Sequence, residues 1–181
     1  MIAPWKIFGR LGNSLFQYAF LYSYAKDTDV DLYFQDPTHF EAHDEEIHDL
    51  FSQGVVPIDM IAIHLRRGDY VDNPFYVDLT MTKYYDKAMK EFAGEQFLVF
   101  SDDIEWAKRF FIGNEFEFSE DKTELEDLNL MAGCKAIIMA NSSFSWWGAY
   151  LGDRNKKVIA PKDWHPDGID RTVCPETWKK I

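Results

Sequence analysis

The sequence contains few cysteines and no long apolar segment. Its two cysteines, Cys134 and Cys174, are too few for a disulfide framework or a cysteine-lined metal cage, and we expect Cys134 to pack as a small apolar side chain. No apolar run approaches the roughly 20 residues of a membrane-spanning helix, and the first residues lack a signal-peptide pattern. These absences predict a cytoplasmic protein with no integral membrane segment.

The sequence also lacks an excess of basic residues. Its formal net charge is −12, whereas binding to nucleic acid or to an anionic membrane requires a basic surface. We therefore expect no nucleic-acid partner, and any positively charged site must be local. With 181 residues, of which 46% are hydrophobic, the chain is large enough for one well-packed globular domain.

From residue 61 onward, strand-like and helix-like segments alternate, which predicts an α/β fold with a Rossmann-like parallel sheet. The expected strands are 61–65, 96–101, 115–118, 136–140 and 157–160. The expected helices between them are 83–92, 104–111, 125–132 and 145–151.

The segment before residue 61 has a different organisation. It predicts a short strand at 6–8, an aromatic-rich helix at 13–25 and an amphipathic helix at 40–51. The glycine and proline of 54–59 indicate a boundary. We therefore expect a first region at 1–57 and a Rossmann-like domain at 58–181.

Residues 64–70, His-Leu-Arg-Arg-Gly-Asp-Tyr, directly follow the apolar alternation of 61–63. They lie where a buried strand ends, and ligands of open α/β sheets bind at such ends. Guanidinium groups match phosphate oxygens and stay charged at any useful pH. Arg66 and Arg67 therefore predict an anion site, and the structural alternative is a surface ion pair with Asp69.

Two further segments place hydrogen-bond donors at the start of a helix. Residues 9–13, Gly-Arg-Leu-Gly-Asn, precede the first helix, and residues 141–148, Asn-Ser-Ser-Phe-Ser-Trp-Trp-Gly, follow the apolar run 136–140. Helix N-termini offer free N–H groups and the positive end of the helix dipole. Ordinary capping, by Asn13 or by the serines, explains each segment alone. Three donor clusters in an acidic chain favour a bound anion.

Carboxylates follow a second strand. Residues 101–103, Ser-Asp-Asp, close the strand at 96–101, where a carboxylate can accept paired hydrogen bonds from a guanine edge. The alternative is that Ser101 or Asp102 caps the next helix. Most of the acids at 124–127 are expected on a solvated surface.

Metal ligands are sparse in this sequence. His39 and His43 have helical spacing without a convincing further ligand, and His43 and His48 are expected on the surface of an amphipathic helix. Because a catalytic metal site needs several converging ligands, we expect no metal.

Taken in order, the motifs at 9–19, 64–70, 100–103 and 141–148 resemble the bacterial α-1,2-fucosyltransferase family, glycosyltransferase family 11. The resemblance implies GDP-fucose as the donor substrate and a glycan hydroxyl, on a galactoside, as the acceptor. It further implies a GT-B-like donor domain at 58–181 that binds the GDP-sugar, preceded by a much reduced N-terminal domain. No cofactor other than the donor is implied.

The resemblance also implies roles for the motif residues. Arg66 and Arg67 would hold the β-phosphate. His64 and Asp102 would contact the guanine or the ribose. The groups around the diphosphate would come from Gly9, Gly12, Asn13, Ser142, Ser143, Phe144 and Ser145.

The implied reaction is inverting and independent of metal. As the C1–O bond breaks through an oxocarbenium-like state, Arg66 and helix N-termini would neutralise the charge that grows on GDP. Asp69 is the nearest motif carboxylate to act as a catalytic base, and its alternative role is to orient the arginines.

Two features depart from the family pattern. Family members have a much longer segment between the glycine and arginine motifs than the one between Gly12 and His64, and Ser14 stands where glutamine is usual. A non-catalytic GDP-sugar-binding module and a nucleotide-sugar hydrolase therefore stay open as alternatives, since an open site admits water. A homo-oligomer, with its interface at the first helix or near Trp164 and Trp178, is a further expectation.

Overall fold

The computed structural model describes residues 11–27, 44–168 and 174–181. Three sequence-based expectations lie outside these ranges: a role for Gly9, a strand at 6–8, and the placement of His39 and His43.

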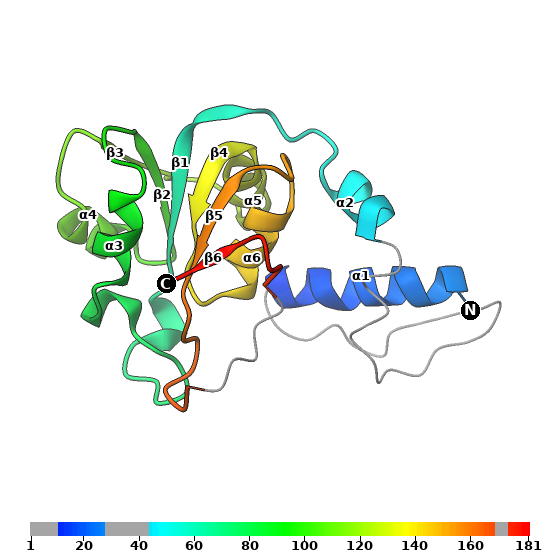
Figure 1. Cartoon of the computed structure of the whole chain (residues 1–181), viewed down its shortest axis with the longest axis horizontal. Helices are drawn as coiled ribbons and strands as arrows, with labels where there is room; N and C mark the ends of the chain where they lie inside the picture. Colours follow the sequence, from blue (N-terminus) through cyan, green and yellow to red (C-terminus); the bar gives the residue numbers. More distant parts are fainter. Residues whose placement is uncertain (1–10, 28–43, 169–173) are drawn as a thin grey trace.

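The described residues form a sheet flanked by helices (Figure 1). The strands are β1 (Ile58–Leu65), β2 (Phe97–Ser101), β3 (Phe116–Phe118), β4 (Cys134–Ile138), β5 (Lys157–Ala160) and β6 (Lys179–Lys180). The helices are α1 (Leu11–Asp27), α2 (Asp44–Phe51), α3 (Tyr84–Lys90), α4 (Ile104–Phe110), α5 (Glu124–Gly133) and α6 (Ser143–Tyr150). Short 3-10 turns occur at Gly68–Tyr70 and Leu79–Met81.

The sheet confirms the expected α/β, Rossmann-like class. In the described ranges its six strands have the order β3-β2-β1-β4-β5-β6, and every neighbouring pair is parallel. From β1 the chain adds β2 and β3 on one side of the sheet. It then returns to the other side of β1, where it adds β4, β5 and β6. The strand order therefore reverses between β1 and β4, where a crevice opens at the carboxyl ends of open α/β sheets.

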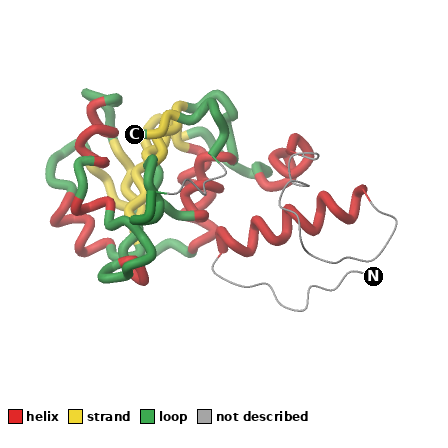
Figure 2. The backbone as a smooth tube through the Cα atoms, turned by 60° about the horizontal axis from the view of Figure 1, so that its bottom comes forward, coloured by secondary structure: helices red, strands yellow, loops and turns green. Residues whose placement is uncertain are grey.

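Helices cover both faces of the sheet, as Figure 2 shows. Side chains of successive strand residues point to opposite faces, so Ile61 and Ile63 pack on the side of α3 and α4, and Ala62 packs on the side of α5 and α6. All three side chains are buried, at 0–2% exposure. The two apolar layers fix β1 at the centre of the fold.

The predicted elements all form within the described ranges, with small shifts at their ends. Helix α6 begins at Ser143, two residues earlier than expected, because Ser142 caps it. Strand β4 begins at Cys134, which pairs with Ile58 of β1 and is buried as expected. The sequence did not predict β6, because its two exposed lysines carry no apolar alternation.

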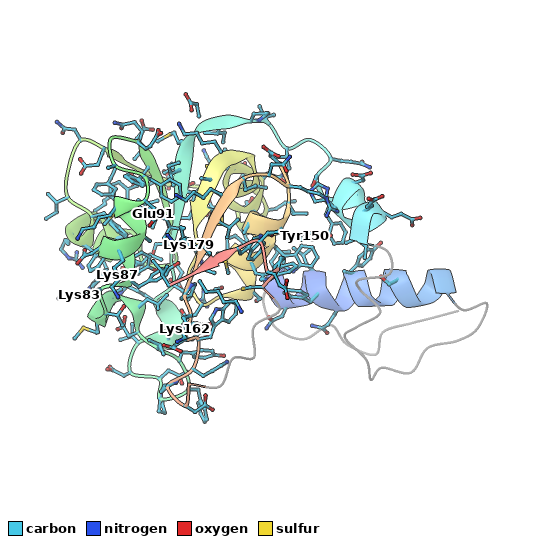
Figure 3. All side chains as sticks on the ribbon, in the orientation of Figure 1. Lys83, Lys87, Glu91, Tyr150, Lys162 and Lys179 are labelled. Carbon is cyan, nitrogen blue, oxygen red and sulfur yellow. The ribbon has the colours of Figure 1, made fainter. Side chains whose placement is uncertain are left out.

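Strand β6 is held to the sheet partly by charge. Glu91, directly after α3, accepts hydrogen bonds from Nζ of Lys179 at 2.7 Å and from Nζ of Lys157 at 3.1 Å. Figure 3 shows Glu91 close to Lys179. These hydrogen bonds lower the pKa of the Glu91 carboxyl group. Each exposed ion pair contributes little to the free energy of unfolding. We infer that these pairs mainly fix the position of this short strand beside α3.

Helices α1 and α2 lie beside each other, and α1 extends away from the sheet (Figure 1). Helix α1 begins at Leu11, so Asn13 lies inside the helix and the capping role considered for it is wrong. The expectation of an exposed His48 is also wrong. This residue is buried, and its Nε2 lies 2.9 Å from the carbonyl oxygen of Gly152, which attaches α2 to the end of α6. No described helix is long and apolar enough to cross a bilayer.

The contact between α5 and α6 depends on a glycine. A Cβ atom at Gly148 would lie 2.4 Å from Sδ of Met131. We therefore expect Gly148→Ala to overpack this contact and to lower the free energy of unfolding by about 1–3 kcal/mol, measured by urea denaturation. In the double variant with Met131→Ala, the new methyl group fills vacated space, so the losses should be less than additive. Additive losses would contradict this packing.

Candidate functional site

A cleft of about 580 Å³ opens at the C-terminal ends of β1, β2 and β4, where the strand order reverses. Nine of the residues expected at the site line it: Gly12, Asn13, His64, Arg66, Asp69, Asp102, Ser142, Ser143 and Phe144. The remaining lining residues are Tyr70, Tyr76, Phe100, Ser101, Lys122, Glu124, Asp127, Trp164 and His165. The structure thus brings four separate motifs together.

Arg66 is held at the cleft by two carboxylates. Its side chain is 11% exposed; one terminal nitrogen contacts Asp69, and Nη1 lies 2.8 Å from Oδ2 of Asp102. Oδ1 of Asp102 also accepts the backbone N–H of Arg67 at 2.8 Å. A Cβ atom at Gly68 would lie 2.3 Å from Oδ2 of Asp102, so this approach requires glycine. Asp102 therefore positions the arginine motif, and Asp69 contacts the same guanidinium.

Arg67 does not line the cleft. Its guanidinium carbon lies 3.8 Å from the centre of the Trp106 ring, and its Nε lies 3.5 Å from Oδ2 of Asp103. Asp103 also caps α4 by accepting the backbone N–H of Trp106 at 3.2 Å. The expectation that Ser101 or Asp102 caps this helix is wrong, because Oγ of Ser101 accepts the N–H of Asp103 and turns the chain first.

His64 is a buried, neutral imidazole beside Arg66. Burial, and secondarily the charge of Arg66, lower the pKa of His64 to about 3. Its ring lies 5.5 Å from that of Phe144, and its carbonyl oxygen accepts a 2.9 Å hydrogen bond from the hydroxyl of Tyr85. Its Nδ1 is buried and has no hydrogen-bond partner among the described residues. The site therefore holds a neutral polar ring next to a fixed positive charge.

The N-termini of α1 and α6 meet at the cleft. Oγ of Ser143 donates to Oδ1 of Asn13 at 2.7 Å, and Nε1 of Trp147 donates to the carbonyl oxygen of Gly12 at 3.0 Å. A Cβ atom at Gly12 would lie 2.6 Å from the backbone nitrogen of Phe144. The two helix ends can approach this closely because residue 12 is glycine. Both ends carry partial positive charge, which suits an anion.

Ser142 and Ser145 have structural roles in this turn. Oγ of Ser142 accepts the backbone N–H of Phe144 at 3.3 Å and caps α6. Ser145 is fully buried, with its Oγ 3.1 Å from the carbonyl oxygen of Ala140, and it does not line the cleft. Ser142 therefore lies at the cleft as expected, whereas Ser145 supports the turn from inside.

Asp127 lines the cleft, although its segment was expected on a solvated surface. It is half-buried, and burial raises the pKa of its carboxyl group. Its Oδ1 accepts a 2.6 Å hydrogen bond from Oγ of Ser119. Asp127 lies four positions before the buried Met131, and residues at this spacing share one face of a helix. This spacing was the sequence signal that could have placed Asp127 on the inner face of α5.

The aromatic lining residues Tyr70, Tyr76 and Trp164, together with His165, were also missed as site residues. They come from two segments about 90 positions apart, and no local spacing connects them.

Comparison with known proteins identifies related sequences. The family model described as glycosyl transferase family 11 matches residues 6–179. An Escherichia coli protein named alpha-1,2-colitosyltransferase is 33% identical over 178 aligned residues, which cover 82% of this chain and 61% of that protein. The E. coli O-antigen biosynthesis glycosyltransferase WbnK is 32% identical over 176 residues, covering 81% of this chain and 58% of its own length.

A more distant relative comes from a mammal. Galactoside alpha-(1,2)-fucosyltransferase 1 of Rattus norvegicus is 28% identical over 123 residues, covering 59% of this chain and 32% of the rat protein. The chain spans about three fifths of the length of the two E. coli relatives. No solved structure gives a significant match.

The buried imidazole predicts a specific dependence of stability on pH. Because the pKa of His64 falls from 6.5 to about 3 on folding, only the unfolded chain binds this proton between those pH values. Stability therefore decreases as pH falls through that window, by at most about 1.4 kcal/mol per pH unit from this group. We expect His64→Asn to lose this contribution in guanidinium unfolding measured at pH 7, 6 and 5. Equal pH slopes in both proteins would contradict a neutral buried His64.

Proposed function

Because this chain belongs to glycosyl transferase family 11, we propose that it transfers fucose from GDP-fucose to a hydroxyl group of a galactoside. The observation that carries the proposal is the convergence of Arg66 with the N-termini of α1 and α6 on one cleft. Guanidinium groups and helix N-termini both bind phosphate oxygens. Together they suit the diphosphate of a nucleotide-sugar donor.

In the proposed reaction, a bond forms between the acceptor oxygen and C1 of the sugar while the bond from C1 to the phosphate oxygen breaks. The acceptor hydroxyl releases its proton to solvent water, and GDP leaves with the bonding electrons. A single displacement of this kind inverts C1. We propose that it needs no metal, because Arg66 and the two helix ends line the same cleft and would neutralise the charge on GDP. The contact of Asp69 with Arg66 favours an orienting role for this carboxylate over the role of base.

The guanine end of the donor is assigned to Asp127. Asp102 was the expected contact for the base or ribose, but its two oxygens already bind Arg66 and the N–H of Arg67. Asp127 is a second carboxylate in the same cleft, and its Oδ1 accepts a hydrogen bond from Ser119. Ionised carboxylates only accept hydrogen bonds. They therefore suit the two donors, N1–H and N2–H, on the guanine edge.

A donor-binding module without transfer is the second candidate, favoured by the short segment between Gly12 and His64. Calorimetric titration with GDP, GDP-fucose and GDP-mannose tests both candidates, and absence of binding would exclude them together. GDP release is then measured with and without β-galactosides. Release that depends on the acceptor supports transfer, release without acceptor supports hydrolysis, and no release supports binding alone.

The arginine provides the most direct test of the phosphate site. We expect Arg66→Ala to reduce turnover by about 10²–10³-fold, the usual loss when a fixed donor to a developing anion is removed. The folded state should persist by circular dichroism. Arg109→Ala removes an exposed arginine that does not line the cleft and serves as the matched control. Unchanged turnover in Arg66→Ala would refute the assigned role, and loss of turnover in EDTA would refute metal independence.

The carboxylate of Asp127 is tested by nucleotide selectivity. Asparagine cannot accept both guanine hydrogen bonds, so Asp127→Asn should weaken GDP binding about tenfold. It should also reduce the preference for GDP over IDP, whose base lacks the N2 amino group. Glu124→Gln is the matched control, because Glu124 is an exposed carboxylate on the same helix and in the same cleft. Equal effects of the two substitutions on GDP and IDP would contradict the assignment.

A further inference from the structure

Part of the cleft is an aromatic wall made of Tyr70, Tyr76, Trp164 and His165, which the donor site as proposed does not use. The rings of Tyr70 and Tyr76 stack with their centres 3.8 Å apart and their planes within 4° of parallel. The ring of His165 lies 5.6 Å from that of Tyr76. All four members of this aromatic wall line the cleft, and their rings are mostly apolar.

Hydrogen bonds from Asn141 fix the aromatic wall in place. Its Nδ2 donates to the carbonyl oxygens of Val77 and Trp164, at 3.0 and 3.1 Å. Its own carbonyl oxygen accepts the hydroxyl of Tyr70 at 3.0 Å, and the N–H of Val77 donates to Trp164. Asn141 is 1% exposed and directly precedes the Ser142 cap. The same turn therefore positions both the phosphate-binding helix end and the aromatic wall.

The aromatic wall differs chemically from the phosphate site. Tyrosine and tryptophan are uncharged, and Nδ1 of His165 lies 2.7 Å from the carbonyl oxygen of Phe75, which places a proton on Nδ1. The uncharged tyrosine and tryptophan rings give no charge compensation to a diphosphate. They do suit a pyranose ring, whose C–H groups form an apolar face while its hydroxyls point outward.

One observation places the aromatic wall beside the phosphate site, and a second shows that the wall has an unsatisfied hydrogen-bond donor. The guanidinium carbon of Arg66 lies 5.5 Å from the centre of the Tyr70 ring, so the phosphate site adjoins the wall. Nε1 of Trp164 is buried and has no acceptor among the described residues. A buried donor without a partner is costly, and a sugar hydroxyl oxygen that reached it would supply the missing acceptor.

We propose that the aromatic wall is the acceptor subsite and binds the neutral pyranose ring of the acceptor sugar against Tyr76 and His165. This inference rests on the proposed function and extends it, because it locates the second substrate in the same cleft. The guanine base is the competing occupant, since it too stacks on aromatic rings. Placing guanine at Asp127, on α5, leaves the wall to the acceptor.

Substitutions at His165 test the subsite by binding. The wild-type chain, saturated with GDP, is titrated with methyl β-D-galactopyranoside and with lactose, and saturation-transfer NMR detects the bound sugar. We expect His165→Ala to weaken sugar binding about five- to tenfold through loss of ring contact. His165→Phe keeps a flat ring and should stay within about twofold of wild type. Ile112→Ala is the control, because Ile112 is 80% exposed and does not line the cleft.

The outcomes separate this inference from the proposed function. GDP affinity is measured on the same samples and should not change in His165→Ala. Weaker GDP binding in that variant assigns the wall to the nucleotide and overturns the subsite. A chain that binds GDP but neither sugar also overturns the subsite and leaves the donor site standing, whereas a chain that binds neither GDP nor sugar overturns both.

Steady-state kinetics add a second readout, because loss of stacking alone should change KM for the acceptor and leave kcat unchanged. Loss of the aromatic ring in His165→Ala should raise KM for the acceptor with little change in kcat. His165→Phe should retain kcat, because stacking needs no ring nitrogen. A kcat that falls equally in both variants would show that the imidazole acts in proton transfer, and would overturn the subsite as stated.

Discussion

The candidate site depends on one carboxylate, that of Asp102. A guanidinium as little exposed as that of Arg66 would be costly without a partner, and the 2.8 Å ion pair with Asp102 compensates it. The second oxygen of the same carboxylate holds the backbone of Arg67, so the arginine motif is fixed in both side chain and main chain. Gly68 is required because any side chain there would occupy the space of this carboxylate. A residue at the end of β2 thus determines the shape of the loop after β1.

The second constraint is the close approach of two helix ends. Gly12 lets α1 touch the first turn of α6, and Trp147 fixes the contact from within the core. Since α6 follows β4 and the arginine loop follows β1, the two positive elements lie on either side of the point where the strand order reverses. A chain with net charge −12 can therefore offer a local anion site without a basic surface.

The sequence predicted the sheet and most of the cleft, because both depend on patterns within short segments. Apolar alternation located β1, and strand ends located Arg66, Asp102 and Ser143. The features that were missed depend on contacts between distant segments: Asp127 is brought inward by the packing of α5, and His48 is buried by the end of α6. Ser145 was predicted to bind the anion, but its hydroxyl hydrogen-bonds the backbone carbonyl of Ala140. A serine near the start of a helix can donate to either acceptor, and the sequence does not distinguish them.

The two carboxylates beside Arg66 indicate how this arginine could bind a diphosphate. Two carboxylates already contact its guanidinium and compensate part of its charge, so a phosphate gains most from Arg66 if one of them moves away. The side chain of Asp102 is 20% exposed and also holds the backbone, whereas the side chain of Asp69, within the short 3-10 turn Gly68–Tyr70, is 57% exposed. Asp69 is the more exposed of the two carboxylates, so water can solvate it when a phosphate oxygen takes its place on Arg66. The site can therefore keep Arg66 oriented before binding and still release its charge to the donor.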